Sequence, residues 1–380
     1  MTPTLIRRSL FAFGLCLAGA ALAAEPIKIA TIVELSGSGA TAGTNFKNGM
    51  DLAIKEINAA GGVLGRPILS ASMDSQSSPA MARSLTLKAI DQDVFTVFGP
   101  VFSGSILASM GETRRAEIPN FTGGEAANIT QQGNPYIFRT SFTQAAAIPK
   151  VARYISRIAG IKNLAVLYVN NDFGRGGHEV LLKALNPAKT NVVADIAIEP
   201  GQGDFSAAVL KVKQSNADGV FVYVNDDESA RALRELRKQG WSKPVIGETT
   251  LIGQKVVDQA GEAANGAVAH VGLTVGAPNP GVQAFRARFE KEYKYMPDHN
   301  CMKGYSGVFV FKAAIEKVGK LDRKAVAAAL HGLKLKVAQQ PGILMDVEYN
   351  DKGDLNRESY MVEVKHGKQE VVLTLPMISE

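Results

Sequence analysis

The chain has 380 residues, which is long for one compact domain and suits two. Hydrophobic residues make up 46% of the sequence and charged residues 21%, a composition that is typical of a globular α/β protein and excludes a coiled coil or a disordered chain. The 42 Lys and Arg residues and the 36 Asp and Glu residues are interspersed without a basic stripe, which argues against nucleic-acid binding.

Residues 1–24 predict a secretory signal peptide. Arg7 and Arg8 form a basic start, residues 10–22 an apolar run, and residues 21–23 an A-x-A cleavage pattern. A membrane span needs roughly 20 apolar residues, so this run favours export over the alternative of a membrane anchor. We therefore expect a soluble periplasmic protein whose one remaining cysteine, Cys301, forms no internal disulfide.

In the first half of the chain, short apolar runs alternate with stretches whose apolar residues recur every three or four positions. These patterns predict strands at residues 27–33, 68–73, 94–98 and 118–122, and helices at 46–60, 79–91 and 103–117. Their strict alternation predicts a mostly parallel sheet with helices on both faces.

The same unit occurs a second time. Strands are predicted at residues 164–169, 192–198, 219–224 and 245–247, and helices at 176–185, 204–215 and 227–239. This repetition predicts a second lobe that is similar to the first.

The last hundred residues predict no third sheet. Helices are expected at 282–295, 303–318 and 324–330, and hairpin strands within 345–370 around a turn at 350–354. These pieces complete the two lobes, so the chain must cross between them at 140–144, 271–276 and roughly 345–351, which together form a hinge. The predicted lobes are residues 25–142 with 273–347, and residues 143–272 with 348–380.

In open parallel sheets, ligands bind beyond the carboxyl ends of the strands. The first such loop contains Gly37, Gly39 and Gly43, and Asp74 ends the next strand, a pattern that imitates a dinucleotide fingerprint. A Rossmann dehydrogenase is therefore an alternative. Because the third glycine comes one residue late and an exported protein meets little nicotinamide cofactor, we expect no cofactor.

Two loops of the first lobe are candidate binding segments. Ser103 lies where a helix begins, and a hydroxyl with free helix N–H groups suits a carboxylate, although a simple N-cap is the alternative. Thr122, Gly124 and Ala126 follow the next strand, where glycines expose backbone groups, although an ordinary turn has the same composition.

The second lobe offers Asn225 and Glu248, which also lie just past strands. A carboxylate here suits an ammonium group; Asp227, by contrast, is interpreted as a helix N-cap. Phe102 and Phe173 are candidates for the apolar walls of a pocket, with a place in the buried core as the alternative.

Enzyme signatures are missing from the sequence. There is no G-x-S-x-G elbow and no P-loop, and the histidines have no metal-ligand spacing, so we expect neither catalysis nor a bound metal. The five histidines are His178, His270, His299, His331 and His366.

Motifs spread over nearly the whole chain carry a family resemblance. The most specific is N-A-A-G-G-V-L-G-R at residues 58–66. Others lie at 27–30, 36–37, 49–53, 138–140, 172–174, 204–205 and 349–354. In this order they resemble type I periplasmic solute-binding proteins of the leucine/isoleucine/valine kind, which serve ABC transporters.

The resemblance implies an α/β fold with two Rossmann-like lobes that are joined by three strands and close over one ligand. It further implies that Ser103, with backbone groups near Gly124 and Ala126, holds a carboxylate and part of an amino group. Positions matching Phe173, Asn225, and Glu248 or Thr249 complete the site.

The sequence departs from the branched-chain pattern at the side-chain end of the site. Phe173 and Asn225 stand where those binders place tyrosines, Ala126 replaces a threonine, and Ala42 replaces an aromatic residue. We expect a monomeric binding protein for an amino acid, branched-chain or similar, or a related small carboxylate, which delivers its ligand to membrane permease subunits. Binding of aromatic acids and ligand sensing are the alternatives.

Overall fold

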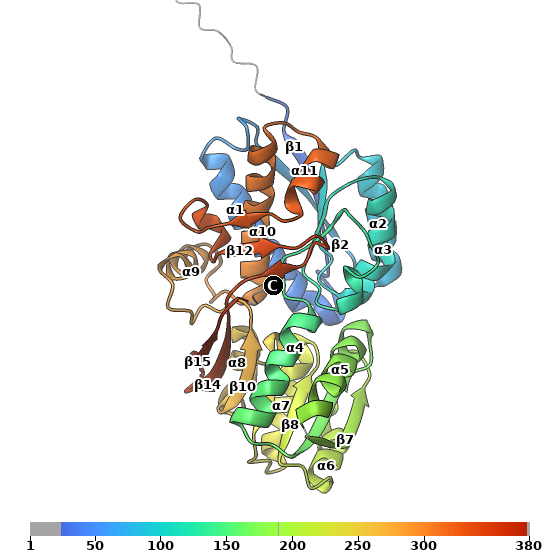
Figure 1. Ribbon diagram of the computed structural model, residues 1–380, viewed down its shortest axis with the longest axis vertical. Helices are drawn as coiled ribbons and strands as arrows, with labels where there is room; N and C mark the ends of the chain where they lie inside the picture. Colours follow the sequence, from blue (N-terminus) through green and yellow to red (C-terminus); the bar gives the residue numbers. More distant parts are fainter. Residues whose placement is uncertain (1–23, 189, 378–380) are drawn as a thin grey trace, which may run out of the picture.

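The computed structural model describes residues 24–188 and 190–377, and the predicted signal peptide lies outside this part except for its last residue. Two lobes lie one above the other in Figure 1, and each contains its own β-sheet. Within the described residues, no helix is long and apolar enough to cross a membrane.

The first lobe contains a five-stranded parallel sheet in the order β2-β1-β3-β4-β5. Its strands are β1 (Ile27–Val33), β2 (Ile68–Asp74), β3 (Thr96–Phe98), β4 (Asn120–Thr122) and β5 (Ile137–Arg139). Its helices are α1 (Ala40–Ala59), α2 (Pro79–Asp91), α3 (Ser103–Arg115), α9 (Pro280–Tyr293), α10 (His299–Val318) and α11 (Arg323–Leu330).

Alternation along β1 explains how this sheet is covered on both faces. Ile27, Ile29 and Val33 belong to the core under α1 and α10, while Ala30 and Ile32 pack with the α2 side. Since successive side chains of a strand point to opposite faces, a strand with buried residues on both faces requires helices on both sides.

The second lobe contains a seven-stranded sheet in the order β15-β14-β10-β9-β8-β6-β7, which is parallel from β10 to β7 and antiparallel at β14 and β15. Its strands are β6 (Asn163–Val169), β7 (Asn191–Ile198), β8 (Gly219–Tyr223), β9 (Val245–Glu248), β10 (Ala267–Val271), β14 (Ser359–Lys365) and β15 (Lys368–Leu375). Its helices are α4 (Gln144–Arg153), α5 (Asp172–Leu185), α6 (Ser206–Gln214), α7 (Asp226–Lys238) and α8 (Gln254–Ala260).

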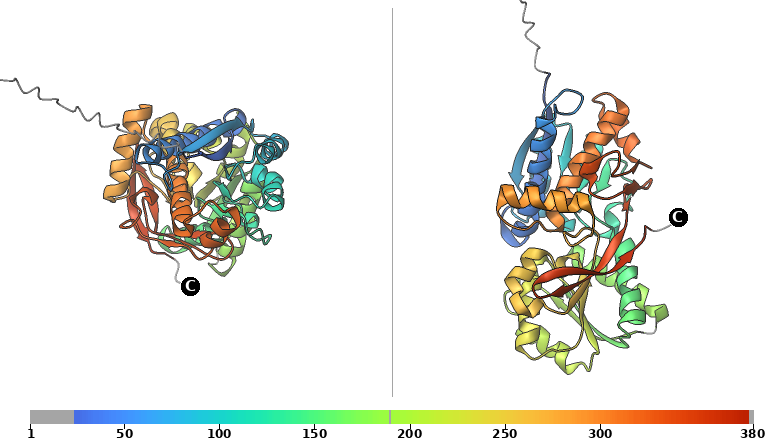
Figure 2. Two further views of the ribbon diagram at one scale, coloured as in Figure 1. Left: turned by 90° about the horizontal axis from the view of Figure 1, so that it is seen from above. Right: turned by 90° about the vertical axis from the view of Figure 1, so that its left-hand side faces the viewer.

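Three segments connect the lobes, as the two views of Figure 2 allow the reader to follow. The first lies between β5 and α4 and the second between β10 and α9, where crossings were predicted. The third joins β13 (Leu355–Asn356) to β14 and comes later than predicted.

The third crossing comes late because the preceding hairpin belongs to the first lobe. β11 (Lys334–Leu335), β12 (Val347–Tyr349) and β13 form a small antiparallel sheet, and the Tyr349 hydroxyl donates to the Arg139 carbonyl oxygen at 2.6 Å. The Arg139 N–H donates to the Gly353 carbonyl oxygen at 2.9 Å. The predicted boundary between the first lobe (to residue 347) and the second lobe (from residue 348) therefore falls inside this small sheet. The chain enters the second lobe later, after β13.

Helices α1 and α10 cross with their backbones in contact, and a glycine on each helix makes this possible. A Cβ atom added at Gly49 would lie 1.8 Å from the Cys301 carbonyl oxygen, and one added at Gly304 would lie 2.0 Å from the Phe46 carbonyl oxygen. No larger residue fits at either position unless the helices separate.

We predict that Gly304→Ala destabilises the first lobe by about 1–3 kcal/mol, because the added methyl group overpacks the α1–α10 crossing. The matched control is Gly111→Ala in α3, where the new Cβ would meet only the end of the Arg115 side chain at 3.8 Å. The control should be stabilising by about 0.5–1 kcal/mol, the helix preference of alanine. Urea unfolding measures both, and equal effects of the two variants would contradict the close crossing.

Candidate functional site

A cavity of about 230 Å³ lies between the lobes. The first lobe contributes the start of α3, the loop after β4 and the start of α10, and the second contributes the loops after β6, β8 and β9. Among the predicted site residues, Phe102, Ser103, Gly124, Phe173 and Asn225 line this cavity.

Ser103 is the first residue of α3, and Phe102 is the N-cap, so the N-cap alternative for Ser103 is wrong. Phe102 provides no side-chain cap, which leaves the first N–H groups of the helix without an intrahelical partner beside the cavity. The Ser103 hydroxyl accepts a hydrogen bond from the Ala126 N–H at 3.3 Å. This end of the cavity therefore offers a hydroxyl and helix amides, which suit an anion.

The loop that contains Gly124 is held from behind by a buried arginine. Arg139 donates to the carbonyl oxygens of Gly124 at 2.8 Å and of Ala126 at 2.7 Å, and its charge is balanced by Asp354 at 2.6 Å. The Ser141 hydroxyl also donates to the Gly124 carbonyl oxygen, at 2.8 Å. The loop position is thus fixed before any ligand arrives.

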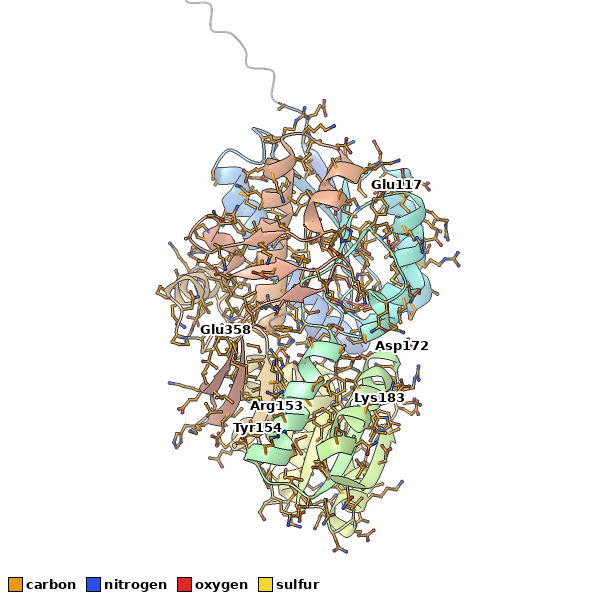
Figure 3. The ribbon with its side chains drawn as sticks, in the orientation of Figure 1. Glu117, Arg153, Tyr154, Asp172, Lys183 and Glu358 are labelled. Carbon is orange, nitrogen blue, oxygen red and sulfur yellow. The ribbon has the colours of Figure 1, made fainter. Side chains whose placement is uncertain are left out.

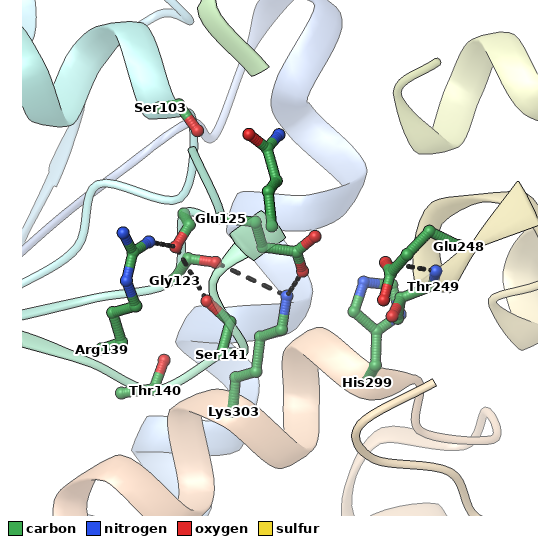
Figure 4. A network of polar contacts seen from close by, with 12 residues as sticks. Ser103, Gly123, Glu125, Arg139, Thr140, Ser141, Glu248, Thr249, His299 and Lys303 are labelled. Carbon is green, nitrogen blue, oxygen red and sulfur yellow. Dashed lines mark hydrogen bonds and ion pairs between the residues drawn. The ribbon is translucent and has the colours of Figure 1, made fainter. Parts of the chain in front are cut away.

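A buried ion pair crosses the floor of the cavity. The Lys303 Nζ atom in α10 lies 2.8 Å from Glu125 Oε1, and both side chains are more than nine-tenths buried (Figure 4). Burial, reinforced by repulsion from Glu248, raises the pKa of Glu125 to about 7 despite the attraction of Lys303. Neither residue was predicted to belong to the site.

The far end of the cavity is formed by Asp226 at the start of α7 and His299 at the start of α10. Burial raises the pKa of Asp226 well above its ordinary value, and repulsion from Asp298 adds to this. Burial also lowers the pKa of His299, with Lys303 adding to the effect, so His299 is neutral at physiological pH.

Several polar atoms at the cavity are buried without a hydrogen-bond partner among the described residues. They include Asp226 Oδ1, Thr250 Oγ1, His299 Nδ1 and Asn300 Nδ2. Each unsatisfied buried group costs about 1–3 kcal/mol, so such a set is expected where a bound molecule supplies the missing partners.

Asn225 lies on the cavity wall but is also tied into its own helix. Its N–H and its side-chain amide both donate to Glu228 Oε2 at 2.8 Å. Asn225 is the N-cap of α7, so the prediction that Asp227 caps this helix is wrong by two residues.

Three predicted site residues do not line the cavity. The Thr122 hydroxyl donates to the Pro100 carbonyl oxygen at 2.9 Å, and the Ala126 N–H is bonded to Ser103. Glu248 is 2% exposed and its Oε1 lies 2.9 Å from His270 Nδ1. Thr122 and Ala126 therefore support the wall from behind, whereas Glu248 approaches the floor of the cavity from the second lobe, next to Glu125.

Contacts between the lobes surround the cavity. The Thr41 hydroxyl of the first lobe donates to Asp227 Oδ1 of the second at 2.8 Å. Gly104 in α3 faces Asp172 in α5, which Figure 3 labels at the junction of the lobes. The cavity is therefore enclosed by both lobes.

A family model described as "Periplasmic binding protein" matches residues 26–369, which is most of the chain. The chain belongs to the periplasmic binding protein family. The predicted resemblance and fold class are thereby confirmed.

The "Leu/Ile/Val-binding protein BraC3" of Rhizobium johnstonii is 28% identical over 352 residues, which cover 90% of this chain and 93% of that protein. The branched-chain amino acid transporter substrate-binding protein LivJ of Streptococcus pneumoniae, solved with isoleucine, has a TM-score of 0.83 at 25% identity and covers 91% of this chain and 99% of its own. A solute-binding protein of an ABC transporter from R. palustris, solved with benzoate, shares the fold with a TM-score of 0.86 at 23% identity. The match covers 93% of this chain and 98% of that protein.

We predict that Glu125→Gln flattens the pH dependence of stability of the ligand-free protein. The pKa of Glu125 in the fold, about 7, exceeds its ordinary 4.5, so the fold favours the neutral carboxyl group. Its contribution to stability is complete below the ordinary value and is lost as pH rises through about 7.

The melting temperature at about pH 5 minus that at about pH 8 should therefore be larger for the wild type than for Glu125→Gln, because the other titrating groups are common to both proteins. Glu179→Gln, an exposed substitution in α5, is the control. If Glu125→Gln retained the full wild-type difference, the assignment of this titration to Glu125 would be wrong.

Proposed function

We propose that this protein is the extracytoplasmic substrate-binding protein of an ABC importer, and that it captures an amino acid, branched-chain or similar, or a related small carboxylate by hinge closure. The observation that carries the proposal is the set of unsatisfied buried polar groups inside a cavity enclosed by two lobes. The names of the curated relatives support the amino acid as ligand class.

The carboxylate of the ligand would bind at the start of α3, where Ser103 and the first helix amides meet the cavity. Phe102 and Phe173 would contact the apolar body of the ligand, and Val101 extends this wall. Binding would need no covalent chemistry, so the protein would act as a carrier and not as an enzyme.

An aromatic acid is the second candidate ligand. The wall has two phenylalanines, while Ala42 leaves space where the branched-chain pattern has an aromatic residue. Some neighbours of the same fold were solved with benzoate or hydroxybenzoates. The carboxylate of an aromatic acid would bind at the same end of the site as the carboxylate of an amino acid.

In the proposed mechanism, a monomer in the periplasm binds its ligand on the first lobe, and contacts from the second lobe stabilise the closed form. The hydrogen bond between Thr41 and Asp227 forms only when the lobes meet. The closed form would then dock on the membrane permease subunits and release the ligand there.

We predict that a thermal-shift panel of amino acids and aromatic acids identifies a ligand, since saturation at about 100 times its Kd should stabilise the protein by about 2.7 kcal/mol. For the best ligand, Ser103→Ala should weaken binding by about tenfold, because a hydrogen bond to a charged group is lost.

Ser109→Ala is the matched control, because Ser109 lies in the same helix but donates to the Ser105 carbonyl oxygen away from the cavity. Calorimetry measures both variants. A panel without any stabilising carboxylate would contradict the proposed function, and equal affinities of the wild type and Ser103→Ala would contradict the carboxylate site.

We predict that Gly104→Trp blocks closure of the lobes. A Cβ atom at Gly104 would already lie 2.9 Å from Asp172 Oδ2 on the opposite lobe, so an indole there would hold the lobes apart. Ligand affinity should fall by at least about tenfold, and small-angle X-ray scattering should show no compaction on ligand addition. Gly111→Trp in the same helix is the control and should close normally.

A further inference from the structure

The cavity has a second polar end that the carboxylate site does not use. Figure 4 shows Ser103 and His299 on opposite sides of Lys303. Asp226 lies beside His299, with Asp226 Oδ1 3.9 Å from His299 Nε2. The two ends of the cavity are therefore separated by the buried ion pair of Lys303 and Glu125.

The other charged groups around this second end are already engaged. Asp298 caps α10 by accepting the Cys301 N–H at 3.0 Å and also accepts the Asn45 side-chain amide at 2.7 Å. Lys303 is bound to Glu125, and Asp227 is bound to Thr41. Among the titratable groups at this end, Asp226 and His299 remain uncommitted, and the Thr250 hydroxyl and the Asn300 amide on the cavity also have no partner among the described residues.

The spacing of this pair fits one bridging atom. A distance of 3.9 Å is too long for a hydrogen bond between Asp226 and His299. One donor atom could lie about 2.9 Å from each of them and bridge the gap. Both side chains are more than nine-tenths buried, so a partner must come from within the cavity.

The local charge selects the kind of partner. Asp226, Asp227 and Asp298 interact electrostatically at this end, and the nearest ammonium group, that of Lys303, is paired. A carboxylate or another anionic group would be repelled here, whereas a hydrogen-bond donor or a cation would be attracted.

We infer that the natural ligand carries a hydrogen-bond donor, a hydroxyl or an ammonium group, at the end opposite its carboxylate, and that Asp226 and His299 bind this group. The inference rests on the proposed function, because it assumes that the carboxylate occupies the Ser103 end. It narrows the ligand class to small molecules with two polar ends and an apolar middle that contacts Phe102 and Phe173.

The test compares near-isosteric ligand pairs that differ in the distal donor: benzoate with 4-hydroxybenzoate, phenylalanine with tyrosine, and norleucine with ornithine. Calorimetry on the purified protein should show at least about tenfold tighter binding for the donor-bearing member of one pair. Asp226→Asn should reduce this ratio toward one. Asp258→Asn in α8 is the matched control and should keep the ratio, since Asp258 is exposed on the second lobe and does not line the cavity.

The ligand pairs also distinguish a hydroxyl donor from an ammonium donor. An ammonium group would lower the raised pKa of Asp226 and so favour release of a proton on binding, which makes the measured enthalpy depend on the buffer, whereas a neutral hydroxyl would lower that pKa less. Asp226, Asp227, Asp298, His299 and Lys303 face this end, and Asp226→Asn isolates the contribution of the first.

The outcomes separate this inference from the proposed function. If the ligands without a distal donor bind as tightly as their partners, or more tightly, the inference is overturned and carboxylate capture stays intact. The same holds if the affinity ratio within a pair is unchanged in Asp226→Asn. Stabilisation by Zn²⁺ alone that is lost in Asp226→Asn, without any donor preference, also overturns it, in favour of a metal site. If no member of any pair binds, the proposed function fails and the inference fails with it.

Discussion

The geometry of the cavity depends on the close crossing of α1 and α10. Gly49 and Gly304 allow each helix to contact the backbone of the other, which fixes both the depth and the rotation of α10. The residue next to Gly304 is Lys303, and one helical turn earlier lies His299, so both side chains project from the same side of α10 into the cavity. A small change at the crossing would therefore alter the floor and the far end of the site together.

Much of the architecture could be predicted from the sequence because local patterns carry it. The strand at residues 27–33 and the helix at residues 79–91 were predicted with their observed bounds, since apolar alternation defines the first and Ser78 with Pro79 marks the start of the second. The strand β5 and the helix α8 were not predicted, because 3 and 7 residues are too few to show a period. The helix α4 was not predicted although its buried residues recur with helical spacing, because Pro149 lies inside it and proline usually marks the end of a helix.

The site was only partly predictable, for a different reason. Five of the predicted residues line the cavity because they lie just past strands, where ligands of open parallel sheets bind. They are Phe102, Ser103, Gly124, Phe173 and Asn225. Lys303 and His299 lie on a helix that reaches the cavity only through tertiary packing. The helix was predicted to begin at residue 303, but the Asp298 side chain accepts the Cys301 N–H as an N-cap, and this capping pattern was the available signal. Glu248 ends a strand as well, yet its contact with His270 and its approach to Glu125 depend on tertiary packing, which no local pattern reveals.

The hydrogen bond between Thr41 and Asp227 has a kinetic consequence. Since both lobes line the cavity, contacts of this kind would hinder the departure of a captured molecule until they are broken. The residence time of the complex would then follow the opening rate of the protein. Solutes of unequal affinity would leave at comparable rates where their affinities differ mainly through the association rate. A docking transporter that separates the lobes would thus control unloading by acting on the rim, at a distance from the solute itself.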